Sequence, residues 1–519
     1  MRLTVGLGAL AIVAGALLLG GVVPAGGDPR PSVATTPAVS AEIPVTPMDQ
    51  SLGAGYNSPA VLADPTEPRF VVMANRLDAP DFSCALQVSG NAGRGWLPAD
   101  PVPELPRGTE RCYAPEVAFD RDGVLYYLFV GLAGEGNEPV GAFLTTSSDR
   151  ARTFTPPRRV LGPLKFGVRM ALDPDIGSQG RVHLVWVDAT SDPPTGGFGP
   201  LPNPILTAHS DDGGKTFSKP ITLGGGGNER VVGPALALGP DHAVHVAWYD
   251  LKDDARDYQG LDGPVWQGNW AIAASSSTDG GRSFPRPTVV DDEIVPHERV
   301  MLIFTMPPPS LAVQGKRLCA AWTDARYGDA DAVLRCSLDG GRRWGGLRRL
   351  NDDARGNGRW QYMPRLAVSP GGRIDAAFYD RRRDRANLMA DVYATYSIDG
   401  AEHFAPNLRL SSESFDTSIG QQYLHPSSAG LYEFGGRIGL LSRRHGTVVA
   451  WADTRNSRPD TTSQDLFASV VRLPEPEGGS TRTGVVGGAL VGLGVLLVTV
   501  AAVVRRRRRS PSTPDGAAS

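Results

Sequence analysis

Lysine is almost absent from this chain of 519 residues, which contains only five. Arginine therefore carries nearly all of the positive charge, and the formal net charge is −3. Without a basic excess there is no electrostatic reason to expect nucleic acid as a partner. The chain also lacks the residue spacings of a zinc site, a phosphate-binding loop or a Ser-His-Asp triad. We therefore expect no cofactor and no metal.

Long helical periodicity is missing from the body of the chain as well. Short apolar stretches, glycine turns and stretches of alternating apolar and polar residues take its place, as is typical of β-strands. Residues 364–380 show this order of strand, turn and strand clearly. They contain the apolar stretch Pro364–Val368, a turn at Gly371 and Gly372, and the alternating stretch Arg373–Asp380. At 41% hydrophobic residues the chain is able to bury a large core. These features favour an all-β fold.

A turn with the pattern S-x-D-x-G-x-x-W/F recurs along the chain. Its six copies are Ser89–Trp96, Ser147–Phe154, Ser210–Phe217, Ser277–Phe284, Ser337–Trp344 and Ser397–Phe404. The first copy has Asn91 in place of the aspartate, and the second and last copies lack one glycine. Copies at a spacing of roughly 60 residues indicate a repeat architecture.

The residue types of this Asp turn have a structural explanation. An aspartate accepts hydrogen bonds from backbone N–H groups of its own turn. Glycine supplies the positive φ that such a turn needs. The aromatic residue is expected to fold back as an apolar plug. We therefore predict a structural role for these aspartates and do not take them as catalytic candidates.

The strand that ends in aromatic-x-Asp defines the repeat unit. It ends at Asp188, Asp250, Asp324, Asp380 and Asp453, with weaker copies at Phe70–Arg76 and Val124–Val130. Seven four-stranded units around an axis form a β-propeller, which leaves few exposed strand edges. We predict an all-β propeller of seven blades, with six blades as the alternative. The last unit, Arg437–Leu473, has three strands, and Ala41–Pro47 is expected to supply the missing outer strand.

The two ends of the chain read as targeting and anchoring segments. We predict a signal peptide at 1–25, a Pro/Ala/Thr-rich linker at 26–45, the propeller at 46–473, a linker at 474–483, a transmembrane helix at 484–504 and a basic tail at 505–519. An uncleaved N-terminal anchor is the alternative to the signal peptide. Because Arg505–Arg509 belongs on the cytoplasmic side, we expect a single-pass cell-membrane protein with an extracellular propeller and a cytoplasmic C-terminus.

Four cysteines in an exported chain predict two disulfides. Cys319 and Cys336 lie symmetrically about the expected hairpin tip Arg326–Asp329, so they should face each other across two antiparallel strands. Cys84 and Cys112 are then left to pair with each other.

The loops are expected to sort onto the two sides of the ring. If the Asp turns join third and fourth strands, the loops that lead into the first strands lie on the opposite side. These lead-in loops carry Arg111, Arg169, Arg230, Arg299 and Arg359. In one interpretation the rim pairs Asp324–Arg326, Asp380–Arg382 and Asp453–Arg455 are structural. In the other, lead-in arginines, above all Arg111 and Arg230, converge on an anion at the mouth of the channel.

The Asp turns on four-stranded units resemble the Asp-box, or BNR, repeats of the sialidase (neuraminidase) superfamily, over about residues 50–473. Ala114–Gly123 looks like the second blade of bacterial sialidases, and Asn228–Val232 is similar to the segment that carries the family's nucleophile-activating glutamate. The chain departs from the family in two places. Asn57 stands where the family has its first arginine, and Ser427 stands at the position expected for the nucleophile.

This resemblance implies a glycoside hydrolase of the exo-α-sialidase type. The family uses a tyrosine nucleophile, a glutamate partner, an aspartate acid/base and three arginines that hold the sugar carboxylate. Carried onto this chain, the resemblance implies Glu229 as the glutamate, Asp78 or Asp81 as the acid/base, and Arg76, Arg111 and Arg230 as carboxylate ligands. Tyr432, with Tyr423 as the alternative, takes the place of the nucleophile if the loop around Ser427 is shifted.

Two functional hypotheses follow from the sequence. The first is a cell-surface, sialidase-like propeller that binds or hydrolyses acidic glycans, so that its partner is a glycan or glycoconjugate. The second is a catalytically inactive propeller that serves as an extracellular binding or scaffold module. The sequence does not indicate an oligomeric state.

Overall fold

The computed structural model divides the chain into two compact units, Met1–Pro476 and Glu477–Ser519. The residues that the structure describes all belong to the first unit: 36–46, 53–100, 102–135, 137–188, 202–227, 229–254, 267–297, 307–419, 434–457 and 463–476. The predicted signal peptide, transmembrane helix and basic tail lie outside these residues. Within them, no helix is long and apolar enough to cross a membrane.

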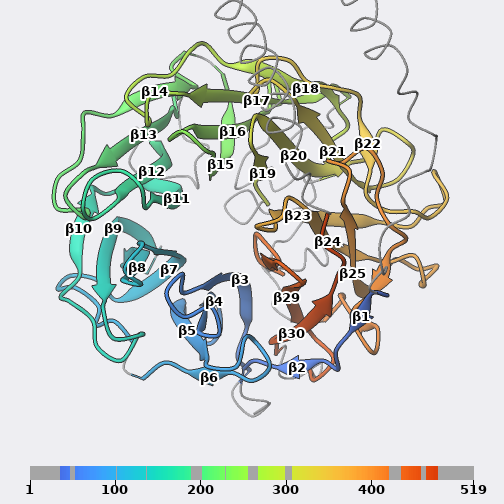
Figure 1. Ribbon diagram of the computed structural model, residues 1–519, viewed down its shortest axis with the longest axis horizontal. Coiled ribbons are helices and arrows are strands. Elements are labelled where there is room, and N and C mark those ends of the chain that lie inside the picture. Colours follow the sequence, from blue (N-terminus) through green and yellow to red (C-terminus); the bar gives the residue numbers. More distant parts are fainter. Residues whose placement is uncertain are drawn as a thin grey trace, which may run out of the picture. The chain divides into compact units, whose positions relative to one another are not determined.

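Seven antiparallel sheets make up the first unit (Figure 1). Blade 1 contains β3 (Tyr56–Ala63), β4 (Val71–Leu77), β5 (Ser83–Ser89) and β6 (Leu97–Pro98). Blade 2 contains β7 (Arg111–Phe119), β8 (Leu125–Ala133), β9 (Glu138–Ser147) and β10 (Arg158–Leu161). Blade 3 contains β11 (Lys165–Asp173), β12 (Arg181–Asp188), β13 (Ile205–Ser210) and β14 (Ile221–Gly224).

The remaining blades follow the same order. Blade 4 contains β15 (Val231–Leu238), β16 (Val244–Asp250), β17 (Trp270–Ser277) and β18 (Thr288–Ile294). Blade 5 contains β19 (Ser310–Gln314), β20 (Arg317–Asp324), β21 (Asp331–Ser337) and β22 (Arg348–Arg349). Blade 6 contains β23 (Gln361–Val368), β24 (Ile374–Asp380), β25 (Met389–Ser397), β26 (Leu408–Arg409) and β27 (Phe415–Asp416). Blade 7 contains β28 (Gly439–Arg443), β29 (Gly446–Asp453) and β30 (Asp465–Arg472), joined by β1 (Ala38–Val39) and β2 (Ile43–Pro44).

The first strands line the centre of the ring. Each contacts the first strand of the next blade, and β28 contacts β3, so the ring is closed. Figure 1 shows the blades arranged around this axis. The prediction of seven four-stranded blades is confirmed, and the six-bladed alternative is wrong.

The N-terminal segment supplies the outer strand of blade 7, as predicted. It does so in two pieces, with Ala38 opposite Arg472 in β1 and Ile43 opposite Ala468 in β2. The pairing begins at Ala38, inside the segment predicted as a linker. Next to β2, Val45 is buried and donates its N–H to the Leu466 carbonyl at 2.8 Å. The first and last parts of the propeller are therefore joined in one sheet.

The Asp turns join the third and fourth strands of blades 1 to 6. In the turn of blade 5, the Asp339 carboxylate accepts the N–H groups of Arg342 and Arg343 at 3.0 and 2.9 Å. The Ser337 hydroxyl donates to the same carboxylate at 2.8 Å. The two residues after the aspartate have positive φ in every copy, including Arg150 and Ala151, which replace glycines. The predicted hydrogen bonding and backbone geometry are confirmed.

Each Asp turn also packs against the preceding blade. A Cβ at Gly341 of blade 5 would lie 2.9 Å from the Ser276 hydroxyl of blade 4, and one at Gly93 of blade 1 would lie 3.2 Å from Val448 of blade 7. The turn aromatics join core clusters shared between their own blade and the one before: Trp96, Phe154, Phe217, Phe284, Trp344 and Phe404. The plugs therefore seal the junctions between blades.

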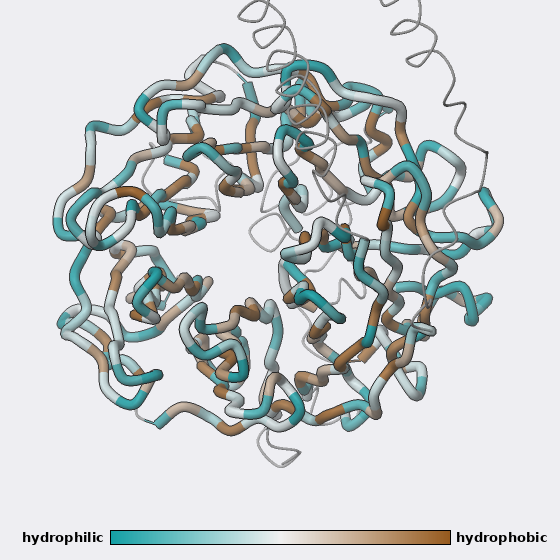
Figure 2. The backbone as a smooth tube through the Cα atoms, in the orientation of Figure 1, coloured by the Kyte–Doolittle hydropathy of each residue, from teal (hydrophilic) through white to brown (hydrophobic). Residues whose placement is uncertain are grey.

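The second strand of each blade forms the centre of the core. Its aromatic position is fully buried in blades 3 to 7, at Trp186, Trp248, Trp322, Phe378 and Trp451. Hydrophobic segments, brown in Figure 2, lie within the blades, whereas many of the outer turns are hydrophilic. Burial of such large side chains stabilises each sheet against its neighbours.

Both predicted disulfides are confirmed. Cys319 of β20 lies directly opposite Cys336 of β21 and is bonded to it. Cys84 of β5 is bonded to Cys112 of β7, so the second disulfide links blade 1 to blade 2. No described cysteine is free.

Replacing Val45 by aspartate should open the closing sheet. Val45 is 4% exposed, so Val45→Asp buries a charge beside Leu466 and should lower the free energy of unfolding by about 3 kcal/mol. Val39→Asp is the matched control, because Val39 is 37% exposed on the same segment. Limited proteolysis and denaturant unfolding measure the effect. Equal behaviour of the two variants would show that this segment does not close the ring.

Candidate functional site

The first strand of each blade is its inner strand. One residue of each inner strand lies at the same level of the central channel. Each of these residues pairs with the residue that directly precedes the core position of the second strand. Around the ring they are Ala60, Glu116, Arg169, Ala235, Ser310, Arg365 and Gly439. Three are charged, and the other four are small and neutral.

A repeated bulge sets the backbone at this level. The inner strands of blades 1, 2, 3, 4 and 6 change register just before it, for example between Tyr113 and Glu116 and between Tyr362 and Arg365. Ala114 and Met363, inside these two bulges, have positive φ. A bulge bends its strand and changes the direction of the side chains beside it. The same kind of bulge therefore precedes all three charged residues, Glu116, Arg169 and Arg365.

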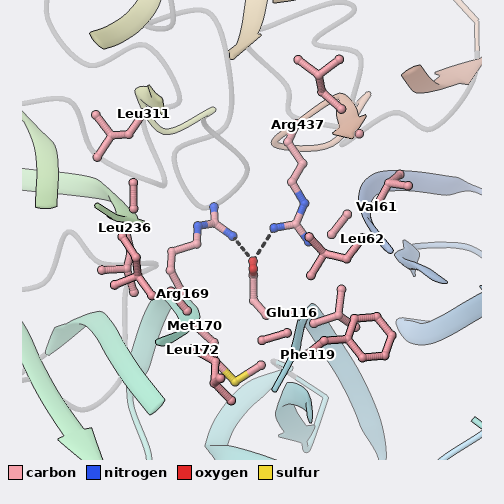
Figure 3. A pocket seen from close by; sticks show the side chains of 18 of the residues that line it. Val61, Leu62, Glu116, Phe119, Arg169, Met170, Leu172, Leu236, Leu311 and Arg437 are labelled. Carbon is pink, nitrogen blue, oxygen red and sulfur yellow. Dashed lines mark hydrogen bonds and ion pairs between the residues drawn. The ribbon is translucent and has the colours of Figure 1, made fainter. Parts of the chain in front are cut away.

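Glu116 receives two arginines in the channel (Figure 3). The Arg169 guanidinium donates to its carboxylate at 2.8 Å, and Arg437 donates to the same oxygen. Arg437 precedes β28 and is fixed by the carbonyls of Pro115 at 2.7 Å and Ser58 at 3.2 Å. We call Glu116, Arg169, Arg365 and Arg437 the channel cluster.

Arg365 differs from the other two arginines of the cluster. No described residue forms a hydrogen bond or an ion pair with its guanidinium. Burial, together with the positive charge of Arg437, lowers the pKa of Arg365 to about 10. The charge on Arg169 acts in the same direction, while Glu116 opposes it. Arg365 therefore remains charged at neutral pH, in an environment that disfavours its charge.

The cluster has an excess of positive charge. Burial raises the pKa of Glu116, but the guanidiniums of Arg437 and Arg169 outweigh that effect and hold the pKa below its ordinary value. Three positive groups and one negative group give a net charge of +2 at neutral pH. Such a group attracts an anion, and guanidinium forks match carboxylate and sulfate or phosphate oxygens.

The cluster lines a cavity of about 600 Å³. The other lining residues are mainly aliphatic and come from the inner strands, including Leu62, Leu172, Leu236, Leu311 and Leu440. Residues of the turns between first and second strands, such as Pro65 and Pro174, complete the wall. These turns are on the same side of the ring as the Asp turns, which we call the Asp-turn side.

Two of the predicted site residues form a pair in blade 1. Arg76 donates from Nε to Asp78 at 2.8 Å, and Asn57 donates to the same carboxylate at 2.8 Å. The Tyr113 hydroxyl accepts a hydrogen bond from Arg76 at 2.6 Å. Burial lowers the pKa of Arg437, and Arg76 contributes to this lowering. The pair therefore lies close enough to the channel cluster to act on its charge.

The other predicted site residues lie elsewhere. Arg111 begins β7, donates to the Gly134 carbonyl at 2.9 Å and approaches Asp81 at 3.9 Å. Glu229 is exposed before β15 and accepts the N–H of Gly227 at 2.9 Å. Arg230 is half-buried beside it and accepts a hydrogen bond from Leu251 through its carbonyl. Tyr432, like Tyr423 and Ser427, lies outside the described residues.

The rim pairs are structural. Arg326 donates from Nε to Asp324 at 2.9 Å, and the same carboxylate accepts the Arg326 N–H at 3.0 Å. Asp380–Arg382 and Asp453–Arg455 repeat both contacts. Arg455 also binds Glu42 of the closing segment at 2.7 and 2.8 Å. This confirms the structural interpretation of the three pairs.

Most of the channel cluster does not follow from the sequence patterns. Arg169 is among the predicted lead-in arginines, and Glu116 lies in the segment that resembles a second sialidase blade, but neither is a predicted site residue. Arg365 and Arg437 are not predicted site residues either. A usable signal exists, because Glu116 and Arg365 each follow a proline at the equivalent position of a first strand.

No model of a known protein family matches the chain, and no curated protein matches it. Among solved structures, a protein of unknown function from Dyadobacter fermentans DSM 18053 has a TM-score of 0.46 at 13% identity and covers 84% of this chain and 99% of that chain. A PL25 ulvan lyase has a TM-score of 0.45 at 12% identity, covering 82% and 96%. A Hadza microbial sialidase has a TM-score of 0.42 at 14% identity, covering 78% and 74%. These values assign no activity, so the sialidase resemblance stays a prediction.

Replacing Glu116 by glutamine should destabilise the protein at neutral pH. Glu116→Gln leaves Arg169 and Arg437 without their counter-charge, which should cost about 3–5 kcal/mol of unfolding free energy. Because the folded-state pKa of Glu116 lies below its ordinary value, its contribution is complete above the ordinary pKa and is lost as pH falls through the folded-state value.

Denaturant unfolding at pH 7 and at pH 3 tests this sign. The difference in unfolding free energy between wild type and Glu116→Gln should be smaller at pH 3 than at pH 7. Glu104→Gln serves as the control, because Glu104 is exposed. A gap that stays constant between the two pH values would show that the Glu116 charge does not stabilise the fold.

Proposed function

We propose that the protein is a propeller that binds an acidic glycan or glycoconjugate, with the channel cluster as its anion-binding group. The observation that supports this most directly is the charged Arg365, with which no described side chain forms a hydrogen bond or an ion pair, beside Arg169 and Arg437. An acidic sugar offers the carboxylate or sulfate that this cluster lacks. The sialidase resemblance suggests the same ligand class.

Binding without hydrolysis fits the described residues best. Glycosidases that use two carboxylates hold both at the scissile bond. Of the two carboxylates that line the cavity, Glu116 is held by arginines, and Asp120 accepts the N–H groups of Asp122 and Val124. Asp78, the acid/base that the resemblance implies, is held by Arg76 and Asn57.

Sialidase-type hydrolysis remains the second candidate, on the strength of the resemblance alone. A fluorogenic sialoside assay with the full-length protein decides between the two. We expect no turnover together with retention of acidic glycans on a glycan array. Turnover that is lost in Asp78→Asn would establish the enzyme instead.

The chain should be held at the cell membrane through residues 484–504. We propose that full-length protein stays with carbonate-washed membranes, whereas a chain truncated after Pro476 is released into the medium. The truncation keeps every described strand, because the last one ends at Arg472. Release of the full-length chain under the same washing would contradict the anchor.

Replacing Arg365 by glutamine should separate binding from stability. Loss of a charge-assisted hydrogen bond should weaken acidic-glycan binding roughly 10–100-fold, which corresponds to about 1.5–3 kcal/mol. Stability should stay equal or rise, because Arg365→Gln removes repulsion with Arg437 and Arg169. Glycan-array titration and thermal unfolding measure the two effects.

Two further variants sharpen this test. Arg342→Gln is the matched control, because Arg342 is an exposed arginine in the Asp turn of blade 5. Glu116→Gln should have the opposite pattern to Arg365→Gln, with tighter anion binding and lower stability. If Arg365→Gln and Arg342→Gln bind acidic glycans as wild type does, the channel cluster is not the binding group.

A further inference from the structure

The wall of the cavity is unusual for a site that binds only a sugar. Above the charged level, the half-buried Leu62, Leu236 and Leu238 line the same space, together with the more deeply buried Leu172 and Leu440. Sugars expose many hydroxyl groups, which need hydrogen-bonding partners when they leave water. An aliphatic wall supplies none, and it gains free energy only when apolar atoms cover it.

The charged and aliphatic parts are separated along the channel. The cluster lies at the level of the bulges, in the middle of the inner strands. The aliphatic residues follow it along those strands toward the Asp-turn side, where Pro65 and Pro174 line the cavity. The cavity therefore has a cationic inner end and an apolar part that extends toward the Asp-turn side, where Asp120 and Arg121 also line it.

Both ends of the propeller chain lie on this same side. Ala38, where the first strand begins, is opposite Arg472, where the last strand ends. After Arg472 the chain is fixed by Glu475, whose carboxylate accepts the Ser369 hydroxyl and the Gly371 N–H at 2.8 Å each. Arg373 donates to the Pro474 carbonyl at 2.9 Å. The last described residues thus lie on the Asp-turn side.

We propose that the ligand is an acidic glycolipid. Its anionic group binds the channel cluster, and the first part of its aliphatic chain lies along the leucines that line the cavity, which we call the leucine wall. This inference rests on the proposed function and specifies its ligand class. A cavity of about 600 Å³ falls within the roughly 300–1,000 Å³ typical of small-molecule sites. The last described residues, up to Pro476, lie on the same side of the ring as the apolar part of the cavity.

Four probes separate the contributions of charge, sugar and chain. They are methyl glucuronide, octyl glucuronide, octyl glucoside and octanoate, titrated into the full-length protein in amphipol. Each buried methylene should raise affinity roughly 4-fold. Octyl glucuronide should therefore bind at least about 100-fold more tightly than methyl glucuronide. Octyl glucoside and octanoate should each bind more weakly than octyl glucuronide.

Two variants at Ala237 test where the aliphatic chain of the ligand binds. Ala237 lines the cavity beside Leu236 and Leu238, so Ala237→Phe fills the apolar part, whereas Ala237→Ser leaves it open. Ala237→Phe should abolish the gain from the octyl chain and should weaken octyl glucuronide far more than methyl glucuronide. Ala237→Ser should keep most of the gain. Arg365→Gln should weaken both glucuronides by the same factor, and partition into the amphipol cancels between variants.

The outcomes distinguish this inference from the proposed function. Equal affinities for the two glucuronides would contradict the glycolipid proposal and leave acidic-glycan binding intact. The same holds if Ala237→Phe does not change the increase in affinity that the octyl chain provides. If octanoate binds as tightly as octyl glucuronide, and Ala237→Phe abolishes this binding, the cavity binds an aliphatic chain but the ligand is not a glycan. If neither glucuronide binds, both proposals are wrong.

Discussion

The docking of each Asp turn onto the preceding blade is the interaction on which the rest of the molecule depends. The turn needs two successive residues with positive φ, and its second such residue lies against the neighbouring blade, as Gly93 and Gly341 show. The aromatic residue then enters a core that the two blades share. Blade 7 has no such turn and is closed instead by β1 and β2 from the N-terminal segment. Six Asp turns, each packed against the preceding blade, and one closing sheet thus hold seven blades around one axis.

Closure of the ring creates the site. Glu116, Arg169 and Arg365 lie on the inner strands of three blades, and Arg437 precedes β28. The four residues are far apart along the chain and meet only because the closed ring brings them to one channel. Bulges before Glu116, Arg169 and Arg365 bring these side chains to the same level. The site is therefore built on paired inner strands, which position side chains more firmly than loops do.

The features that could be predicted from the sequence are those with a local or periodic cause. The Asp turns, the second strands, the pairing of Cys319 with Cys336 and the closing strand each follow from a short pattern. The channel cluster does not, because it depends on how seven strands align around an axis, and the prolines that precede Glu116 and Arg365 mark the bulges without showing which residues meet. The lead-in interpretation also favoured Arg111, whose guanidinium is held by the Gly134 carbonyl.

The fold itself does not require the charge at Arg365. At the same level of the channel, four other blades use Ala60, Ala235, Ser310 and Gly439, and their sheets form equally well. Arg365 thus adds repulsion without a partner among the described residues, and a group that weakens the fold is commonly retained at a functional site. A bound anion removes the repulsion, and an aliphatic chain attached to that anion covers the leucine wall. One amphipathic ligand accounts for both features, whereas a free acidic sugar accounts only for the charge.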